Sequence, residues 1–440
     1  MDIIIKIIQF FLCFTILVGI HELGHFLMAR VFRIRVDKFY IFFDPWFSLF
    51  KFKRGDTEYG LGWLPLGGYV KIAGMIDESM DKEQMKQPVK PDEFRAKPAW
   101  QRLLVMVAGV MMNVLLAIVI YCAVCYTWGD SYFSNQDAKW GYNFNPTAHE
   151  MGFRDGDRFV SIDGEEIDNV MRVQNDLLIT DGGRRVVVER GGEPVTLDIP
   201  FESLLRMRQE KAYEDLFTLR LPFIVDSVSY TSAVEAGLQS GDEVVAIDDL
   251  RDADYPRYRD YLQKHKNDKV LLTVRRDGAL IDSLALPVDA EGRIGVTVTN
   301  PYSLRTQYYT FWESIPAGIH KAGKTISSYW DQLKLIVQPK TKMYEELGGF
   351  VAIGSIFPGS WDWHDFWLKT AFLSIILAVM NLLPIPGLDG GHALFTLWEI
   401  ITRRKPSEKF LEVAQYVGLM IILALLVYAN GNDIYRFFIK

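Results

Sequence analysis

The clearest pattern in the chain is a set of four long apolar stretches separated by polar segments. They run from Ile3 to about Val31, from Leu103 to Trp128, from about Phe366 to Leu383 and from about Tyr416 to Ala429. A helix needs about 20 mainly apolar residues to cross a bilayer, so the pattern predicts a polytopic α-helical membrane protein with four transmembrane helices. A cleaved signal peptide is the alternative for the first stretch, but no small-residue cleavage site follows it.

Basic residues flank the expected spans unevenly. They are frequent in the loop between the first and second spans and in the short loop between the third and fourth. Cytoplasmic loops are enriched in Lys and Arg, so we expect both loops in the cytoplasm, and both termini and segment 129–363 outside the inner membrane. The residues that set this orientation are Arg30, Arg33, Arg35, Lys38, Arg95, Lys97, Arg102, Arg403, Arg404, Lys405 and Lys409.

The first cytoplasmic loop has the composition of a small β-sheet. The predicted strands are Phe39–Phe43, Phe47–Phe52, Thr57–Leu64 and Tyr69–Ile72. Turn residues separate them at 44–45, 54–55 and 65–68. We interpret these segments as a membrane-associated β-hairpin or sheet. The alternative is a β subdomain that lies on the cytoplasmic face.

The outside segment contains an internal repeat. Residues 151–163 align with residues 236–248, so that Gly152, Gly156 and Ile162 each recur 85 positions later. Each copy has a helical turn closed by glycine, then a Gly-Asp turn, an alternating strand and a second β-rich stretch. The repeat resembles a pair of bacterial PDZ domains, which implies two extracytoplasmic α+β domains. Such domains bind extended peptides along a strand edge, whereas filtering or a purely structural role is the alternative.

Apolar residues recur at helical spacing from Phe311 to Ile336, which predicts a surface helix packed on a domain or on the membrane interface. Along the chain we therefore expect the following segments: first span 1–33, β loop 34–100, second span 101–128, PDZ-like domains 144–220 and 221–300, helical connector 305–363, third span 364–400 and fourth span 409–430.

Composition narrows the class of protein further. The 440 residues carry a net charge of −7, 49% are hydrophobic and 23% are charged, which excludes a disordered chain. The acidic balance argues against a nucleic-acid partner. Cys13, Cys122 and Cys125 lie in apolar runs, and we interpret Cys122-x-x-Cys125 as two packing residues rather than a redox or metal motif.

The strongest chemical pattern is His21-Glu22-Leu23-Gly24-His25 inside the first span. Residues four apart lie on one face of a helix, so the two histidines can bind one metal ion. Glu22 is placed to accept a proton from the attacking water. Ionisable residues inside a span are costly and usually functional, which argues against two ordinary histidines of a soluble helix. Imidazole and carboxylate ligands around an open position favour zinc.

A catalytic zinc site needs a third protein ligand. The candidates on the expected cytoplasmic side are Asp389 and His392, which follow Pro384 and Pro386. The two prolines exclude a regular helix at this point. A broken helix at membrane depth must face protein or a wet cavity, in which a carboxylate can be held. We prefer Asp389 as the third ligand and keep His392 as the alternative.

These motifs resemble the site-2 protease family of intramembrane zinc metalloproteases. The first match is His21–His25, and the second is the segment Asn381-x-x-Pro-x-Pro-x-Leu-Asp389-Gly. Segments 67–71 and 94–102 match as well, and the layout of four spans with tandem PDZ domains extends the resemblance over nearly the whole chain. The segment Ala108-Gly-Val-Met-Met-Asn113 departs from the family pattern because it lacks a proline.

The resemblance implies a site and a mechanism. His21, His25 and Asp389 would bind Zn²⁺, and Glu22 would be the general base of peptide hydrolysis. Asn381 and Asn113 would donate hydrogen bonds to the substrate backbone or the oxyanion, or else join helices to one another. Gly67 and Gly68 are further expected substrate-binding residues.

The resemblance also implies a substrate class. We expect cleavage of transmembrane segments of single-span proteins, such as an anti-sigma factor or a signal-peptide remnant, after the ectodomain has been trimmed. A transmembrane helix hides its peptide bonds, so an edge of the predicted sheet would pair with the unwound substrate. The PDZ pair would act as a size filter. The expected partners are these substrates and the lipid bilayer.

Two other functions fit part of the sequence. A transporter or metal carrier would use the broken third span as a midplane site, but it should show more spans and inverted repeats. A catalytically silent PDZ scaffold should have lost Glu22 or a ligand, and all are present.

Overall fold

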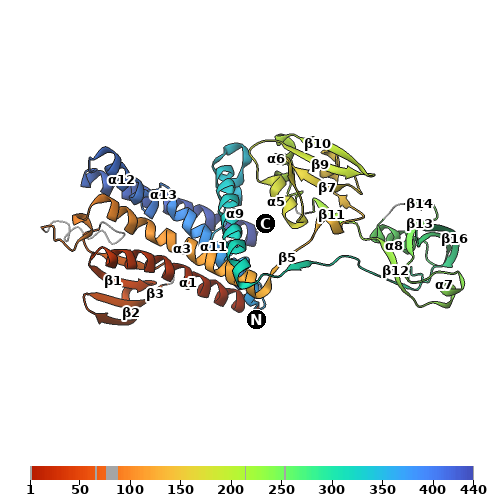
Figure 1. Ribbon diagram of the computed structural model, residues 1–440, viewed down its shortest axis with the longest axis horizontal. Coiled ribbons are helices and arrows are strands. Elements are labelled where there is room, and N and C mark those ends of the chain that lie inside the picture. The colour runs from red at the N-terminus through yellow and green to blue at the C-terminus, as the bar shows by residue number, and fades with distance from the viewer. Residues whose placement is uncertain (1, 65–66, 76–87, 214, 252–253, 440) are drawn as a thin grey trace. The chain divides into compact units, whose positions relative to one another are not determined.

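The computed structural model describes residues 2–64, 67–75, 88–213, 215–251 and 254–439. The chain forms two compact units, which Figure 1 shows with their elements. One, the helical unit, comprises Met1–Asp130 and Tyr308–Lys440. The other, the repeat unit, comprises Ser131–Gln307.

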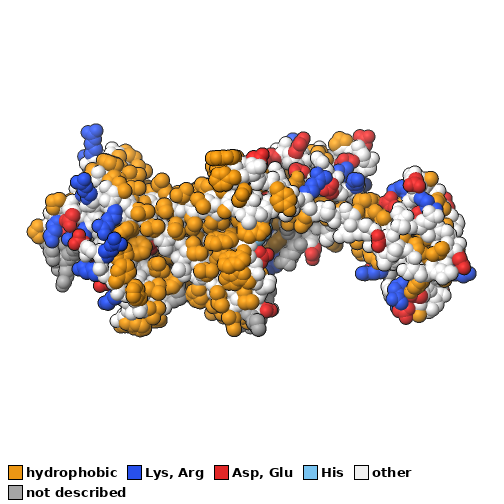
Figure 2. Space-filling model, turned by 60° about the horizontal axis from the view of Figure 1, so that its bottom comes forward, with side chains coloured by type: hydrophobic (Ala, Val, Ile, Leu, Met, Phe, Trp, Pro, Cys, Tyr) orange, Lys and Arg blue, Asp and Glu red, His pale blue; other side chains and the backbone are white. Residues whose placement is uncertain are grey.

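Among the described residues, four helices of the helical unit are long and apolar enough to cross a membrane, in agreement with the four predicted apolar stretches. They are α1 (Asp2–Val31), α3 (Ala99–Trp128), α11 (Trp363–Leu382) and α13 (Glu408–Ile434). The helix α3 begins directly after Pro98 and ends before Gly129, whose φ of 75° favours glycine. Apolar side chains cover much of this unit's surface, as expected for helices that face lipid (Figure 2).

The helix α3 is the centre of the helical unit. The helices α1, α9 (Phe311–Val337), α11 and α12 (Asp389–Thr402) all pack against it. Figure 1 shows α3 beside α1 and α11. The third expected segment, 364–400, is therefore two helices, because α11 ends before the Pro384-Ile-Pro386 turn and α12 begins after it. This short break lies between two helices that both contact α3.

The helix predicted between Phe311 and Ile336 is present as α9. Its buried face, which includes Gly318 and Ala322, packs on α3, while Trp312 on the other face is exposed. Gly318 lies directly against the backbone of Cys122, so no larger residue fits there. All three cysteines are free, and the Cys122 thiol donates to the carbonyl of Ile315. Cys125 is buried and Cys122 is half-buried, as expected for packing residues.

The predicted β loop forms a four-stranded sheet with the order β2-β3-β1-β4. Its strands are β1 (Val36–Ile41), β2 (Phe43–Arg54), β3 (Thr57–Leu64) and β4 (Tyr69–Ile72). The last two agree with the predicted bounds. In contrast, β1 begins three residues and ends two residues earlier than predicted, and β2 is longer at both ends. The predicted turn at 65–68 lies partly outside the described residues. Trp46 on β2 is 90% exposed and stacks on Trp63, so an aromatic surface faces outward from this edge.

The repeat unit contains two copies of one α+β arrangement. In each copy a short helix precedes a strand, α4 before β7 and α7 before β13, and that strand pairs antiparallel with a long strand, β9 or β15. The sheet orders are β10-β9-β7-β8 with β11-β6 in the first copy, and β16-β15-β13-β12-β17 with β14 on β13 in the second. The predicted strands of the repeat are therefore present.

The other α-helices and strands have the following bounds. In the first copy they are β6 (Tyr142–Phe144), α4 (Pro146–Glu150), β7 (Arg158–Ile162), β8 (Glu165–Glu166), α5 (Val173–Leu178), β9 (Arg184–Arg190), β10 (Glu193–Ile199), α6 (Phe201–Gln209) and β11 (Phe217–Leu219). In the second they are β12 (Phe223–Val228), α7 (Thr231–Glu235), β13 (Glu243–Ile247), β14 (Leu250–Arg251), α8 (Tyr255–Lys264), β15 (Lys269–Arg276), β16 (Ala279–Pro287) and β17 (Val296–Val298). Outside the two copies are β5 (Asp130–Tyr132), β18 (Arg305–Gln307) and α10 (Phe350–Ser355).

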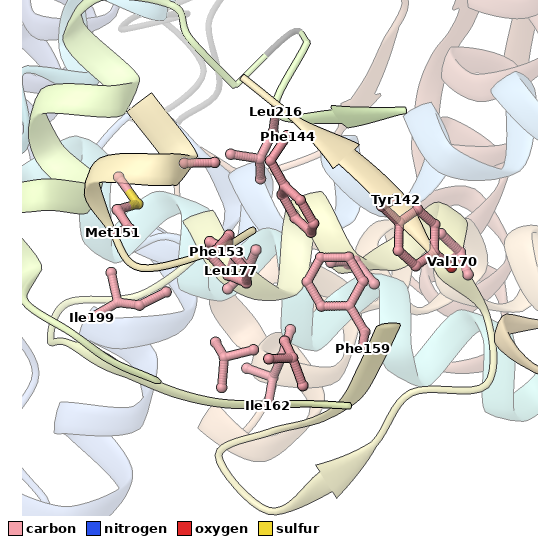
Figure 3. Close-up of a cluster of buried hydrophobic side chains, with 14 of the residues drawn as sticks. Tyr142, Phe144, Met151, Phe153, Phe159, Ile162, Val170, Leu177, Ile199 and Leu216 are labelled. Atoms are coloured by element: carbon pink, nitrogen blue, oxygen red, sulfur yellow. The ribbon is translucent and has the colours of Figure 1, made fainter. Parts of the chain in front are cut away.

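Each copy has its own hydrophobic core and its own buried ion pair. Figure 3 shows the first core, in which Phe144, Phe153 and Phe159 pack together. Beside it, Asp157 accepts hydrogen bonds of 2.7 and 2.8 Å from Arg190. In the second copy Asp242 accepts two bonds of 2.7 Å from Arg276. Both aspartates are fully buried, so each copy contains an equivalent internal Asp–Arg ion pair.

Candidate active site

The helix α1 places its two histidines side by side. His21 and His25 are one turn apart and both are buried, and their Nε2 atoms are 3.3 Å from each other. Gly24 between them lies against the carbonyl of Ala108, so α1 and α3 approach closely at this level. The neighbouring residue Glu22 is partly buried.

The break after α11 brings a carboxylate to the histidines. Asp389 is the first residue of α12, and its Oδ2 lies 3.1 Å from Nε2 of His21 and 3.3 Å from Nε2 of His25. Gly390 lies against backbone carbonyls of the turn, because a Cβ would collide with Leu382 and Leu383 there. This tight turn holds the start of α12 at the site.

The other candidate ligand lies elsewhere. Among the described residues, the group whose ligand atoms could hold one metal ion is His21, His25 and Asp389, and His392 is not part of it. His392 instead lines a cavity with Arg102 and Glu399. The structure therefore brings Asp389, the ligand preferred from the sequence, to the two histidines, and it does not bring His392 there.

The three ligand atoms fit a zinc ion. A tetrahedral zinc with bonds of about 2.0–2.1 Å separates its ligand atoms by about 3.3 Å, close to the observed spacing. Nδ1 of His25 lies 2.8 Å from the carbonyl oxygen of Val105, so Nδ1 carries the proton of this ring. The lone pair on Nε2 then points to the side on which Asp389 lies. Oδ2 of Asp389 accepts no hydrogen bond from the residues that the structure describes, so lone pairs converge where a cation is needed. The residues present therefore fit the metal.

Backbone contacts that the sequence analysis missed shape this site. A Cβ on Gly109 would collide with Nε2 of His25 and would stand 2.9 Å from Nε2 of His21. Glycine at this position is therefore required for α3 to pass close to the Nε2 edges of both imidazoles. The carbonyl of Val105 orients His25 from the same helix. The signal for this stretch in the sequence was the segment 108–113, which lacks the proline of the family pattern.

A buried ion pair braces α12. Nη2 of Arg102, in the first turn of α3, lies 2.5 Å from Oε1 of Glu399 near the end of α12, and both side chains are largely buried. Since Asp389 begins the same helix, this pair fixes the helix that carries the carboxylate. The pairing joins residues 297 positions apart, and no spacing rule predicts it.

The four residues expected to contact substrate lie at different distances from the ligand atoms. Asn381 places its Nδ2 3.4 Å from Nε2 of His21, beside the ligand triangle. Asn113 faces the other side of the same ring, with Nδ2 3.2 Å from Nδ1. Gly68 lies against the side chain of Glu22, and Gly67 lies against the ring of Phe43.

The sheet meets α1 beside Glu22. The backbone of Val70, in β4, lies beside the Glu22 carboxylate. The strand β4 is an edge of the sheet, so its outer side is not paired with another strand of the described sheet. The glutamate therefore lies between the two histidines and a strand edge.

A glutamate beside two histidines and a carboxylate, within apolar helices, defines the class of membrane-embedded metalloproteases. The model of Peptidase family M50 matches residues 9–425, and the chain belongs to this family, the site-2 proteases. It is a zinc-dependent protease. The recognition made from the two sequence motifs is confirmed.

Several relatives match over their whole length. A protein of Clostridium perfringens that is named as a zinc metalloprotease is 28% identical, over 96% of both chains. A Vibrio cholerae protein with the same kind of name is 29% identical, over 99% of both. The regulator of sigma E protease of Haemophilus influenzae is 27% identical, over 97% of this chain and 98% of its own. These names agree with the expected metal and class of enzyme.

Proposed function

We propose that His21, His25 and Asp389 hold the catalytic zinc and that Glu22 is the general base of intramembrane peptide hydrolysis. The observation that carries this proposal is the convergence of three ligand atoms, within 4.8 Å of one another, next to a glutamate. The site lies among helices that are apolar enough to span a membrane. A metal bound there would be reached from within the bilayer.

The side chains around the ligands divide the remaining work. Zinc, when bound, supplies a Lewis acid that polarises the scissile carbonyl and lowers the pKa of water. Glu22 takes the proton of the attacking water and passes it to the leaving amine. The start of β4, at Gly68, packs against the Glu22 side chain and limits where its carboxylate can lie. Asn381, beside the ligand triangle, donates to the carbonyl oxygen as negative charge develops on it.

The substrate we propose is the transmembrane segment of a single-span protein. Such a segment must unwind before its peptide bonds can be attacked, and the outer edge of β4 lies next to Glu22. An unwound segment would add to this edge as a further strand, guided past Gly67 and Gly68. The similarity to a regulator of sigma E protease supports an anti-sigma factor as one substrate.

We also propose that the two repeats are extracytoplasmic PDZ-like domains that limit the size of the substrate's ectodomain. The matching antiparallel pairs β7–β9 and β13–β15 and the matching buried Asp–Arg pairs support two copies of one domain. Lys and Arg gather at one end of the helical unit, at the left in Figure 2, which supports a cytoplasmic location for that end. Both termini and the repeats would then lie outside the inner membrane.

The test of the proposed activity is cleavage by the purified full chain. A single-span model substrate should be cut within its transmembrane segment, and a zinc chelator should stop the reaction until zinc is restored. A transporter or a silent scaffold would leave the substrate intact in both conditions. Cleavage that survives complete removal of zinc would contradict the proposed site.

The size filter has its own test. Deletion of residues 140–300, with α9 retained, should leave cleavage of an already shortened substrate largely intact and should newly permit cleavage of one with a full-length ectodomain. Capture of the trimmed terminus by a PDZ groove predicts the opposite, namely loss of the short-substrate reaction. Both substrates are measured in one membrane preparation, with equal protein levels as the control.

A further inference from the structure

Asn113 has a fully buried side-chain amide in the middle of α3. In the orientation that the structure gives, the hydrogen bonds of this amide do not agree with those of its neighbours. Its Nδ2 lies 3.2 Å from Nδ1 of His21, and its Oδ1 has no hydrogen-bond partner among the described residues. The backbone there is held in place, because Ser374 of α11 donates to the Asn113 carbonyl at 2.8 Å. The contact between the amide and the ring is therefore a fixed feature of two packed helices.

The protonation of His21 decides which way this amide must face. Nε2 of His21 is 3.1 Å from Asp389 and 3.3 Å from Nε2 of His25, so a ligand lone pair belongs on Nε2. A neutral imidazole then carries its proton on Nδ1, which becomes a donor. An amide NH₂ group facing that proton would set one donor against another.

Rotating the amide by half a turn resolves the conflict. The oxygen and the nitrogen of an amide have nearly the same shape, so the hydrogen-bond network decides between the two orientations. In the rotated form Oδ1 accepts from Nδ1–H of His21, and Nδ2 takes the position in which Oδ1 has no partner. A donor–donor contact and an unpaired acceptor are replaced by one good hydrogen bond and one unpaired donor.

We propose that Asn113 is a positioning residue for the zinc ligand His21, whose Nδ1–H its side-chain oxygen accepts. This inference rests on the proposed function, because it requires His21 to be a ligand. His25 is oriented in the same way by the carbonyl of Val105, at 2.8 Å. One helix, α3, therefore orients both imidazoles, through a main-chain oxygen at one and a side-chain oxygen at the other. Acceptors of this kind fix the tautomer and raise the basicity of the ligand.

The experiment measures zinc affinity by competition with a chromophoric chelator, on the full-length protein in detergent. Asn113→Leu removes the acceptor but keeps a branched side chain of four heavy atoms, and it should weaken zinc binding about 10–100-fold. Asn113→Asp restores an acceptor for Nδ1–H and should stay within about threefold of the wild type. If the leucine variant is not recovered, Asn113→Ala makes the same test.

The matched control is Asn381→Leu, since Asn381 touches the same ring on its Nε2 side and is not placed to accept from Nδ1. This variant should bind zinc as the wild type does, and thermal unfolding of the apo forms should be alike in all variants. Wild-type zinc affinity in Asn113→Leu would overturn the inference. Equal losses in the leucine and aspartate variants would also overturn it, because they would indicate packing alone. If loss of the His21 imidazole left the zinc affinity at the wild-type value, the proposed site would be overturned, and this inference with it.

Discussion

Buried carboxylates in the two units of the chain have opposite surroundings. In the repeat unit, Asp157 and Asp242 each accept two hydrogen bonds from one arginine, so both of their oxygens are satisfied. In the helical unit, Oδ2 of Asp389 faces Nε2 of both histidines and accepts no hydrogen bond from any described residue. The first arrangement stabilises a fold. The second leaves a negative oxygen and imidazole lone pairs converging on one point.

The comparison teaches that the partners of a buried carboxylate, rather than its burial, indicate its role. A carboxylate paired with a guanidinium is neutralised internally, and removing either partner leaves an uncompensated charge. A carboxylate that faces neutral imidazoles is compensated only by a cation that binds there. Substitutions of these carboxylates and of Glu22 test the contrast directly.

Glu22→Gln should abolish cleavage while the ligand set stays intact. Removal of a general base costs about 10²–10⁴-fold in rate, and more where the residue also orients the water. Zinc content should remain about one ion per chain, as metal analysis of the purified variant would check. Normal turnover of the model substrate by this variant would refute the role of the glutamate.

Asp389→Ala should lower zinc occupancy strongly, whereas His392→Ala should leave it close to the wild type. The reason is the position of Oδ2 at the ligand triangle and the absence of His392 from it. Metal content after equilibration with a weak chelator measures both. The reverse pattern would require the site to be rebuilt around His392.

Asp157→Asn should destabilise the first copy of the repeat without any change in zinc content. The substitution removes the charge that Arg190 faces, and the loss of such a buried hydrogen-bonded partner costs about 1–3 kcal/mol. Hydrogen exchange of β7 and β9 in the full chain should become about tenfold faster or more. The exposed pair Arg185–Asp198 supplies the control, because Asp198→Asn should leave exchange unchanged.

Asp242 predicts a pH dependence of the second copy. Burial alone would raise the pKa of Asp242, but hydrogen bonds from Arg276 and from the Gln239 amide outweigh burial and hold this pKa below its usual value. The stabilisation is therefore present above the unfolded pKa of about 4 and is lost as the pH falls towards the folded value. Exchange of β13 and β15 should accelerate in acid, and Asp242→Asn should flatten that dependence. An unchanged acid profile in the variant would contradict it.

Local patterns were sufficient for much of the fold. Four apolar stretches predicted the four spans, alternation predicted β3 and β4 with their bounds, and the 85-residue repeat predicted the paired α+β copies. The bounds of β1 and β2 were less accurate, because pairing with β3 extends β2 through residues that alone resemble a turn. The two prolines correctly predicted a break after α11.

The supporting contacts of the site were not predictable from the sequence. The Val105 carbonyl on His25, the glycine close to both imidazoles and the Arg102–Glu399 pair depend on how α3 packs against α1 and α12. None belongs to a local motif. Their partners lie 80 residues or more away, so only the packed helices bring them together.

The sequence by itself determined the residue types of the site and the helix that carries two of them, because positions four apart share one helical face whatever the rest of the chain does. It favoured Asp389 over His392 as the third ligand, but it could not place either side chain beside the histidines. Only the tertiary structure decided which of these two lies at the histidines. The turn at Pro384 and Pro386 begins α12 at Asp389, and its packing on α3 sets Oδ2 at the triangle, about one turn away from His392. That placement is a distance between segments far apart in the chain, and local sequence carries no information about such a distance.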